Sequence, residues 1–263
     1  MKQPTVGIIG YGMVGKAVGA WFKKAAIYSL HQYRDGLEKV NAADVVFLTV
    51  PTPYSARAGY SLSALEHATK RITGKKIVVL KSTVLPGTTV ELQCKYPQHT
   101  WLFNPEFLRD ATNVWDFLHP DRQIIGMPRN TAKHRKAAKL VMRMLPKAPY
   151  EAITTSTEAE LIKLGANCFL ATKIVYANML YDLCKRTGSD YEQVKNGIGN
   201  DPRITTSMMK VGLDGYRGYH KKCFPKDMSA MIWYGKKTKH RLALLETADA
   251  INWKLLPKRL RYR

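Results

Sequence analysis

The chain has 263 residues, of which 45% are hydrophobic and 24% charged, a composition typical of globular domains with packed cores and unlike that of a disordered or collagen-like protein. No apolar run reaches the roughly 18–20 residues that a membrane span needs, and MKQPTVGIIGYG leads directly into an apolar strand, so we expect no signal peptide. The four cysteines form no CxxC pair and the seven histidines no HExxH motif, which predicts a reduced, cytoplasmic and metal-free protein.

The formal net charge of +22 is spread over both halves of the chain. A dispersed positive field favours anionic ligands such as nucleotides and phosphosugars, and it also allows non-specific contact with nucleic acid. The alternative interpretation is a general basic bias on solvated faces.

The first predicted element is an apolar strand at residues 5–9, followed by GYGMVG and by the helical pattern of KAVGAWFKKA. This is a GxGxxG motif between a strand and a helix. Its glycines permit a tight turn, a close approach of the backbone to a pyrophosphate, and close packing of helix on strand. The motif predicts a dinucleotide site, although glycines that serve packing alone are the alternative. The expected site residues are Gly10, Gly12, Met13, Val14 and Gly15.

Further apolar segments separated by helical patterns predict a doubly wound parallel sheet of the Rossmann type. The predicted strands are 26–31, 44–50, 76–81, 100–103 and 122–126. Polar or turn-forming residues follow the C-terminal ends of several strands, and ligands of open α/β sheets bind at that edge. Each could equally be ordinary turn chemistry. These segments are Pro51-Thr52-Pro53, Ser82-Thr83 and Asn104-Pro105-Glu106.

The pattern becomes helical from about residue 152, which predicts a dinucleotide-binding domain over 1–151 and an all-helical domain over 152–263. Residues 156–186 contain no proline and predict a single helix about 46 Å long at 1.5 Å per residue. We expect this helix to link the two domains and to offer a dimer face. Lys163 and Asn167 lie four apart on it. A cation beside an amide suits an oxyanion, but a lysine on an apolar stretch more often extends to water.

Cys223 differs from Cys168 and Cys184, which lie among apolar residues of the predicted long helix. In HKKCFPKD, Pro225 suits the first position of a helix, which places Cys223 just before a helix N-terminus. The partial positive charge there and the surrounding lysines favour a thiolate. Asp227 lies four residues on, in the first turn of the same helix. A loop cysteine with basic neighbours by chance is the alternative.

Seven segments, in order and spanning nearly the whole chain, resemble the UDP-glucose/GDP-mannose dehydrogenase family, most closely its members that oxidise UDP-glucose. They are GYGMVG, VPTP, KSTVLPGTT, NPEFLRDATNVWDFLHPDRQIIG, AELIKLGANCFLATKI, GIGNDPRI and CFPKD. The resemblance implies an NAD-dependent nucleotide-sugar 6-dehydrogenase. Such an enzyme oxidises the C6 alcohol of UDP-glucose or a related sugar to a carboxylate and reduces two nicotinamide cofactors in turn.

The resemblance also implies roles for individual residues. Cys223 would trap the aldehyde as a thiohemiacetal, and a second hydride transfer would give a thioester that water hydrolyses. Lys163 and Asn167 would stabilise the developing oxyanion, while Asp227 and Thr83 would hold or activate water.

The same resemblance implies the rest of the site. Glu106 would support acid–base steps and hydrolysis, and Arg203 would reach the sugar site of a neighbouring subunit in a homodimer. The other implied substrate contacts are Phe107, Leu108, Arg109 and Asp110; the other implied cofactor contacts are Pro51, Thr52, Thr83 and His31.

Three departures from the family pattern alter these expectations. The sequence ends near Arg263, where the family continues into a second α/β domain that grips the nucleotide, so we expect a smaller or differently bound substrate. The glycine-rich run before the cysteine reads GYRGYHKKC. The second strand lacks a terminal acidic residue for the ribose: His31 stands near that position and Asp35 follows late. Because His31 and Arg34 could accept a 2′-phosphate, NADP is an alternative to NAD.

Two other functions stay open. One is a two-electron dehydrogenase of another alcohol, like the β-hydroxyacid dehydrogenases, which needs no nucleophilic cysteine. The other is an inactive relative that binds an anionic partner such as nucleic acid.

Overall fold

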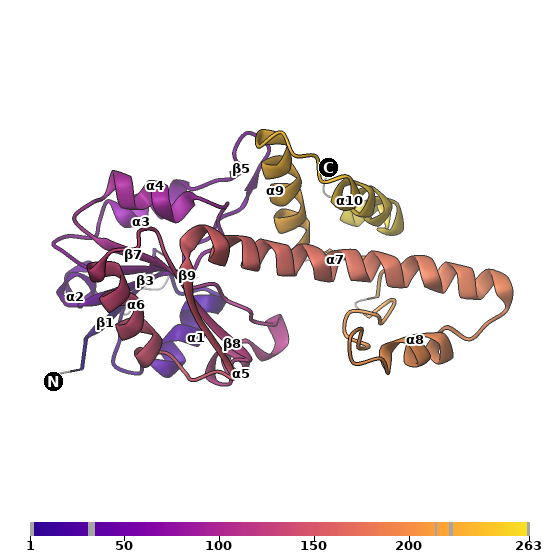
Figure 1. The fold of residues 1–263 in the computed structure, drawn as a ribbon, viewed down its shortest axis with the longest axis horizontal. Helices are drawn as coiled ribbons and strands as arrows, with labels where there is room; N and C mark the ends of the chain where they lie inside the picture. Colours follow the sequence, from indigo (N-terminus) through magenta and orange to yellow (C-terminus); the bar gives the residue numbers. More distant parts are fainter. Residues whose placement is uncertain (1–2, 31–34, 214, 221–222, 262–263) are drawn as a thin grey trace. The chain divides into compact units, whose positions relative to one another are not determined.

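The computed structural model describes residues 3–30, 35–213, 215–220 and 223–261 (Figure 1). They form two compact units: Met1–Pro53 with Tyr60–Lys163, and Tyr54–Gly59 with Leu164–Arg263. The division falls inside helix α7 (Ser156–Thr187). The boundary at 151/152 between a dinucleotide-binding and a helical domain remains a prediction.

The first unit is built on a seven-stranded sheet in the order β2-β1-β3-β6-β7-β8-β9. Its strands are β1 (Val6–Ile9), β2 (Ala26–Tyr28), β3 (Val45–Leu48), β6 (Ile77–Leu80), β7 (Thr100–Phe103), β8 (Arg122–Met127) and β9 (Tyr150–Thr155). Flanking helices make it a Rossmann-type fold, as predicted. Every residue of β1, β3 and β7 is buried, which explains why these strands are apolar runs without alternation.

The predicted parallel pairing holds for every neighbouring pair of this sheet except one. Strand β8 pairs antiparallel with β7, with Phe103 opposite Gly126, while the remaining neighbours are parallel. The chain leaves β7 at its carboxyl end and enters β8 at that same end, where Arg122 lies over the Phe107 ring at 3.8 Å from its centroid. A connection that stays at one edge of a sheet requires the next strand to run back.

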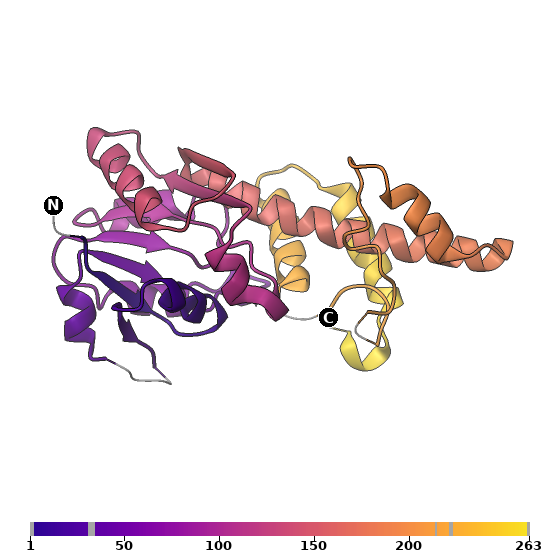
Figure 2. The ribbon, with the colours of Figure 1, turned by 90° about the horizontal axis from the view of Figure 1, so that it is seen from below.

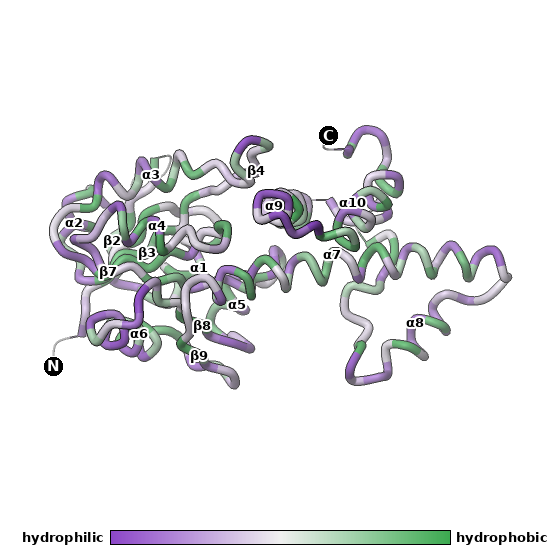
Figure 3. Tube along the Cα trace, turned by 45° about the horizontal axis from the view of Figure 1, so that its top comes forward, coloured by the Kyte–Doolittle hydropathy of each residue, from purple (hydrophilic) through white to green (hydrophobic). Residues whose placement is uncertain are grey.

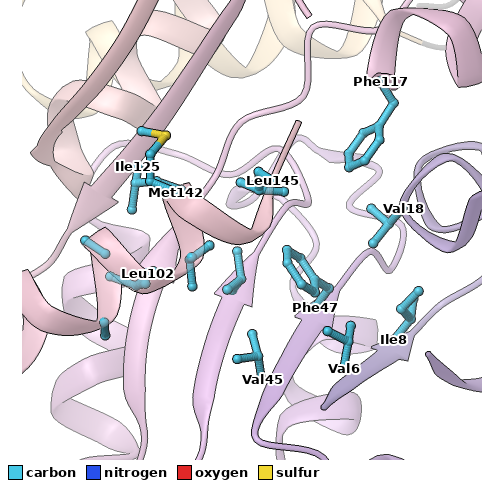
Figure 4. Close-up of a cluster of buried hydrophobic side chains, with 14 of the residues drawn as sticks. Val6, Ile8, Val18, Val45, Phe47, Leu102, Phe117, Ile125, Met142 and Leu145 are labelled. Atoms are coloured by element: carbon cyan, nitrogen blue, oxygen red, sulfur yellow. The ribbon is translucent and has the colours of Figure 1, made fainter. Parts of the chain in front are cut away.

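Helices cover both faces of the sheet. Alternate residues of one strand enter different cores: Val45 and Phe47 face one cluster, while Val46 and Leu48 face the other. Figure 4 shows the first cluster around Phe47. The helices of this unit are α1 (Met13–Trp21), α2 (Leu37–Ala42), α3 (Ser63–Thr69), α4 (Thr88–Lys95), η1 (Asp110–Thr112), α5 (Asn113–Leu118), α6 (Ala132–Met144) and the start of α7.

Three strands of the structure were not predicted from the sequence. Strand β9 reads YEAITT and is half exposed, so it lacks the apolar run of a central strand, and the chain becomes helical at Ser156 and not at 152. The other two, β4 (Tyr54–Ser55) and β5 (Gly59–Tyr60), pair with each other and have only two residues each. Elements so short carry no periodicity to read.

The second unit is helical. Helix α7 runs to Thr187, one residue beyond the predicted end, and Gly188 follows with φ +67°. Its core joins Cys168, Ala171 and Val175 of α7 to Met228 and Ala248. Figure 2 shows the ribbon of these helices from below. The other helices are α8 (Tyr191–Gly199), α9 (Phe224–Lys237), α10 (Ala243–Leu255) and η2 (Lys258–Leu260).

Glu160 of α7 caps another helix of the first unit. The N-terminus of α4 has no side-chain cap of its own. Oxygens of Glu160 accept hydrogen bonds from the Gly87 N–H (2.6 Å), the Thr89 N–H (2.9 Å) and the Thr89 hydroxyl (2.6 Å). These bonds satisfy N–H groups that every helix start leaves unpaired, so Glu160 fastens the first turns of α7 to α4.

We predict that Glu160→Ala lowers the free energy of unfolding by about 1–3 kcal/mol, because buried N–H groups of α4 lose their acceptor. Burial raises the pKa of Glu160 to about 7, although its hydrogen bonds favour the ionised form. At pH 6 the side chain is therefore mostly protonated, and the measured loss contains little contribution from burying a charge. Urea unfolding at pH 6 measures the loss. Glu91→Ala, at an exposed position of α4, is the control; equal losses in both variants would contradict the capping role.

Candidate active site

The glycine motif forms the turn between β1 and α1. Gly10 has φ +95°, and a Cβ there would lie 2.7 Å from the Thr49 carbonyl oxygen. A Cβ on Gly15 would lie 2.2 Å from the Gly10 carbonyl oxygen, so neither position admits a side chain. Gly12, in contrast, faces open space and is the N-cap of α1 with no side-chain cap. An uncapped helix start beside open space fits a pyrophosphate.

Met13 and Val14 open helix α1 behind this turn. The Val14 side chain packs against the first core cluster.

Threonine and serine side chains tie the carboxyl ends of β3 and β6 together. The Thr52 hydroxyl donates to the Thr83 carbonyl oxygen at 2.6 Å, and the Ser82 hydroxyl donates to the Val50 carbonyl oxygen at 2.6 Å. Pro51 is exposed beside them. Two of the segments predicted to converge at this edge, residues 51–53 and 82–83, are thus in direct contact through Thr52 and Thr83.

The end of β2 bears on the choice between NAD and NADP. His31 and Arg34 lie outside the described residues. Asp35 binds back to its own strand: its carboxylate accepts the Ile27 N–H at 3.0 Å and pairs with Lys39 at 3.1 Å.

A buried ion pair lies in the first unit. Lys163 of α7 contacts Glu106, which follows β7, with 2.7 Å between Nζ and Oε1, and both side chains are less than a tenth exposed. The other Glu106 oxygen accepts the Leu108 N–H at 2.9 Å. Burial works to raise the pKa of Glu106, but Lys163, this N–H and the charge of Lys81 outweigh it and hold that pKa below its ordinary value. Glu106 is therefore ionised at neutral pH.

Lys81 is a buried cation that the sequence analysis missed. It ends the segment KIVVLK, and its Nζ donates to the Asn104 side-chain oxygen at 2.6 Å and lies 5.3 Å from the Phe117 ring centroid. Burial lowers the pKa of Lys81 to about 7, the charge of Glu106 opposes this, and that of Lys163 adds to it. A lysine at the end of a run of buried strand residues was the available signal.

The residues after Glu106 form a compact turn. The Arg109 guanidinium and N–H both bind Asp116, the N–H at 2.8 Å, which holds the pKa of Asp116 below its usual range. Phe107 and Leu108 are half buried, while Arg109 and Asp110 are exposed. Asp116 was also absent from the predicted site, because its spacing from the predicted residues 106–110 did not indicate that it binds Arg109.

Cys223 is the N-cap of α9 in the second unit. The helix begins at Phe224, one residue earlier than Pro225 suggested, so the cysteine lies at the helix N-terminus as predicted. Cys223 is half buried, and its backbone carbonyl oxygen accepts a hydrogen bond from the Asp227 N–H at 3.0 Å. The adjacent Lys221 and Lys222 lie outside the described residues. By contrast, burial raises the pKa of the Cys168 thiol to about 12, which leaves that thiol unreactive.

Asp227 is clamped from two directions. The Asn167 side-chain N–H donates to one carboxylate oxygen at 2.6 Å, and Lys226 contacts the other at 2.5 Å, with only 1% of Asp227 exposed. The expected pair of Lys163 and Asn167 therefore binds two different carboxylates, Glu106 and Asp227. Both retain donors, because an ammonium group has three N–H bonds and an amide has two.

Arg203 lies after α8 on the surface. Its guanidinium forms an ion pair with Asp201 at 2.6 Å, and the arginine side chain is 87% exposed. It contacts no other predicted site residue among the described hydrogen bonds and ion pairs. In the described part of the chain, no helix combines the length and apolarity required to cross a bilayer.

Comparison with known proteins identifies the family. Residues 22–145 match the NAD-binding domain, and residues 157–254 the central domain, of the UDP-glucose/GDP-mannose dehydrogenase family. The chain belongs to this family. The resemblance inferred from the sequence is thus confirmed, and the family's NAD-binding domain is present.

Individual relatives agree. The UDP-glucose 6-dehydrogenase YwqF of Bacillus subtilis is 33% identical over 231 residues, which cover 84% of this chain and 50% of that protein. The UDP-glucose 6-dehydrogenase of Rickettsia bellii is 36% identical over 202 residues, 74% of this chain and 45% of that protein. The chain spans about half the length of these curated relatives. A UDP-glucose dehydrogenase structure from Pyrobaculum islandicum superposes with a TM-score of 0.83 at 27% identity, over 95% of this chain and 68% of that one.

We predict that Lys81→Met flattens the pH dependence of stability above neutral pH. Between its folded pKa of about 7 and its ordinary pKa near 10.5, Lys81 binds a proton when unfolded and not when folded, so the wild-type free energy of unfolding rises with pH in this window. The variant should lose up to about 1.4 kcal/mol per pH unit of that rise.

Urea unfolding at pH 7, 8 and 9 measures the slope. Lys75→Met, at an exposed position before β6, is the control and should keep the wild-type slope. If Lys81→Met and wild type have parallel pH profiles, Lys81 is charged in the folded protein and the interpretation is wrong.

Proposed function

We propose that the chain acts as an NAD-dependent nucleotide-sugar 6-dehydrogenase that oxidises a C6 alcohol to a carboxylate through a covalent intermediate on Cys223. The observation that carries the proposal is Cys223 at the N-terminus of α9, four residues before a buried Asp227 that Asn167 holds. A two-electron alcohol dehydrogenase has no use for a thiol placed in this way. UDP-glucose is the first substrate to test, because the similar proteins are named UDP-glucose 6-dehydrogenases.

Cofactor binding follows from the glycine motif. The open space at Gly12 and the uncapped start of α1 would take the pyrophosphate, while Pro51, Thr52 and Thr83 would line the same carboxyl edge. The bound nicotinamide supplies the hydride acceptor for each of the two oxidations. NADP stays an alternative because His31 and Arg34 could bind its 2′-phosphate. The nearby Asp35 carboxylate accepts a hydrogen bond from the Ile27 N–H of β2.

Cys223 accounts for the second oxidation. Its thiolate adds to the aldehyde carbon, a C–S bond forms, and the carbonyl electron pair moves onto oxygen as an oxyanion. Further N–H groups of Asn167 and Lys163 would stabilise that oxyanion. Loss of a hydride from the same carbon leaves a thioester.

Hydrolysis of the thioester needs a base and a positioned water. Glu106 is ionised at neutral pH, so it can accept a proton from water, and Asp227 and Thr83 would orient that water. Attack of the water on the thioester carbon breaks the C–S bond, which releases the carboxylate and returns the thiolate. Phe107, Leu108, Arg109 and Asp110 would contact the sugar nucleotide from the turn after Glu106.

A homodimer through α7 is part of the proposal. Phe169, Tyr176 and Leu183 recur every seven residues and are 70%, 54% and 56% exposed, with Met179 beside them at 51%. Figure 3 shows hydrophobic residues recurring along α7. A seven-residue apolar repeat on an exposed helix is the pattern that packs against a second helix. In such a dimer, the exposed Arg203 would serve the neighbouring subunit.

Polyanion binding is a second candidate function, favoured by one observation. No acidic residue occurs between Asp121 and Glu151. Within this stretch, the exposed face of α6 carries five basic residues: Lys133, Arg135, Lys136, Lys139 and Arg143. A cationic helix face opposite a buried one can contact nucleic-acid phosphates without sequence preference.

We predict two reduced cofactors per sugar oxidised. The measurement is absorbance of the reduced nicotinamide with a panel of UDP- and GDP-sugars and with NAD or NADP. Cys223→Ser should abolish the second equivalent, because an alcohol adds far less readily to an aldehyde than a thiolate does. Cys94→Ser, which alters an exposed cysteine elsewhere, is the matched control and should give two equivalents.

One equivalent per sugar, insensitive to Cys223→Ser, would identify a two-electron dehydrogenase. No reduction by any sugar would contradict the enzymatic proposal. A linear fall of nucleic-acid affinity with salt, weakened by substitutions on α6, would then support the polyanion function.

We predict a dimer of about twice 29.8 kDa that Phe169→Glu/Tyr176→Glu converts to a monomer, because two charges would be buried against a partner helix without counterions. Light scattering after size-exclusion chromatography measures the mass. Leu244→Glu, at an exposed apolar residue of α10 outside the repeat, should stay dimeric. A monomeric wild-type chain would overturn this assembly.

A further inference from the structure

The segment that leads to Cys223 is fastened to helix α10. Tyr219 lies four residues before the cysteine, and it is buried. Its backbone N–H donates to the Asn252 side-chain oxygen at 2.7 Å, and the Asn252 side-chain N–H donates to the Tyr219 carbonyl oxygen at 2.9 Å. A single fully buried amide thus satisfies both backbone groups of one loop residue, as a neighbouring strand would.

Gly218 makes this approach possible. It has φ +78°, a conformation that residues with side chains rarely adopt, and a Cβ there would lie 2.4 Å from the Asn252 side-chain oxygen. The position of residues 218 and 219 along α10 is therefore fixed sterically as well as by hydrogen bonds.

The Tyr219 side chain adds two contacts. Its hydroxyl donates to a carboxylate oxygen of Asp249 at 2.9 Å, and Asp249 is 1% exposed. Its ring meets the Phe224 ring edge to face, with 6.2 Å between centroids. Phe224 is the residue after Cys223, so Tyr219 contacts the chain beyond the cysteine while it is anchored before it.

Asp249 and Asn252 lie three residues apart and so share one face of α10. We propose that Tyr219, Asp249 and Asn252 form a latch that positions the Cys223 thiol at the N-terminus of α9. These are positioning residues, since they hold Tyr219, whose ring contacts Phe224, the residue after Cys223. The inference rests on the proposed function only in taking Cys223 as the nucleophile, and the thiol can be probed without any substrate.

The test is the rate of alkylation of Cys223 by iodoacetamide between pH 5 and pH 10, resolved by peptide mass spectrometry. Tyr219→Phe keeps the ring and removes the bond to Asp249. Asn252→Ala removes both backbone bonds. Cys94 is exposed, so its alkylation rate serves as an internal control for the activity of the reagent. Tyr191→Phe is the matched control: it also removes a buried hydroxyl bond of the second unit, here to the Met209 carbonyl oxygen at 2.6 Å.

We expect Tyr219→Phe to slow Cys223 alkylation at pH 7 by about tenfold and to move the midpoint of its pH profile upward, because a thiol that leaves the helix N-terminus loses the charge that favours thiolate. Asn252→Ala should act in the same direction. Rates at Cys94, and at Cys223 in Tyr191→Phe, should be unchanged. Wild-type alkylation of Cys223 in folded Tyr219→Phe would overturn the latch.

Turnover separates this inference from the proposed function. With an active wild type, Tyr219→Phe should lower kcat about tenfold and leave KM for the sugar nucleotide nearly unchanged, which a general loss of structure would not do. If the wild type oxidises no sugar but the alkylation rates change as expected, the latch stands and the proposed function fails. If turnover and alkylation are both unaltered in Tyr219→Phe, the latch fails and the function stands.

Discussion

The ion pair between Lys163 and Glu106 is the interaction on which the carboxyl edge of the sheet depends. Both charges are buried, and removing Glu106 would leave Lys163 without its partner at a cost of several kcal/mol, roughly 3–5. Lys81 brings a second cation to the same region, so full ionisation would leave one positive charge in excess. The lowered pKa of Lys81 relieves that excess, while its bond to Asn104 links the ends of β6 and β7.

The second unit meets the same constraint differently. Asp227 and Asp249 are its most deeply buried carboxylates among the described residues, and each accepts a hydrogen bond from a side chain of another segment, Asn167 and Tyr219 respectively. These bonds run from α7 to α9 and from the loop to α10. The apolar core that joins the helices gives cohesion but little direction, because hydrophobic contacts are not directional. The buried polar contacts set where the Cys223 segment lies.

Sequence patterns predicted the elements better than their pairings. Fully buried strands such as VVFL stand out as unbroken apolar runs, and α7 stands out as a long proline-free segment with apolar residues at helical spacing. The antiparallel direction of β8 relative to β7 could not be predicted, since it depends on how the connecting residues 104–121 pack. Likewise, a spacing of four suggested that Lys163 and Asn167 act together, but no spacing shows that each binds a carboxylate distant in sequence. Lys81 was missed because a lysine at the end of an apolar strand is a weak signal by itself, and its contacts with Asn104 and Glu106 depend on segments distant in sequence.

The run GYRGYHKKC gains a physical explanation from the latch. Gly218 is restricted twice, because its backbone is left-handed and Asn252 occupies the space of a Cβ. By contrast, a Cβ at Gly215 would meet open space, so φ +77° alone restricts that position. Tyr219 can be large because its ring lies in the core of the second unit with its hydroxyl satisfied by Asp249. Bulky residues are therefore compatible with a fixed cysteine, provided that the contacts with α10 replace the close packing that glycines allow.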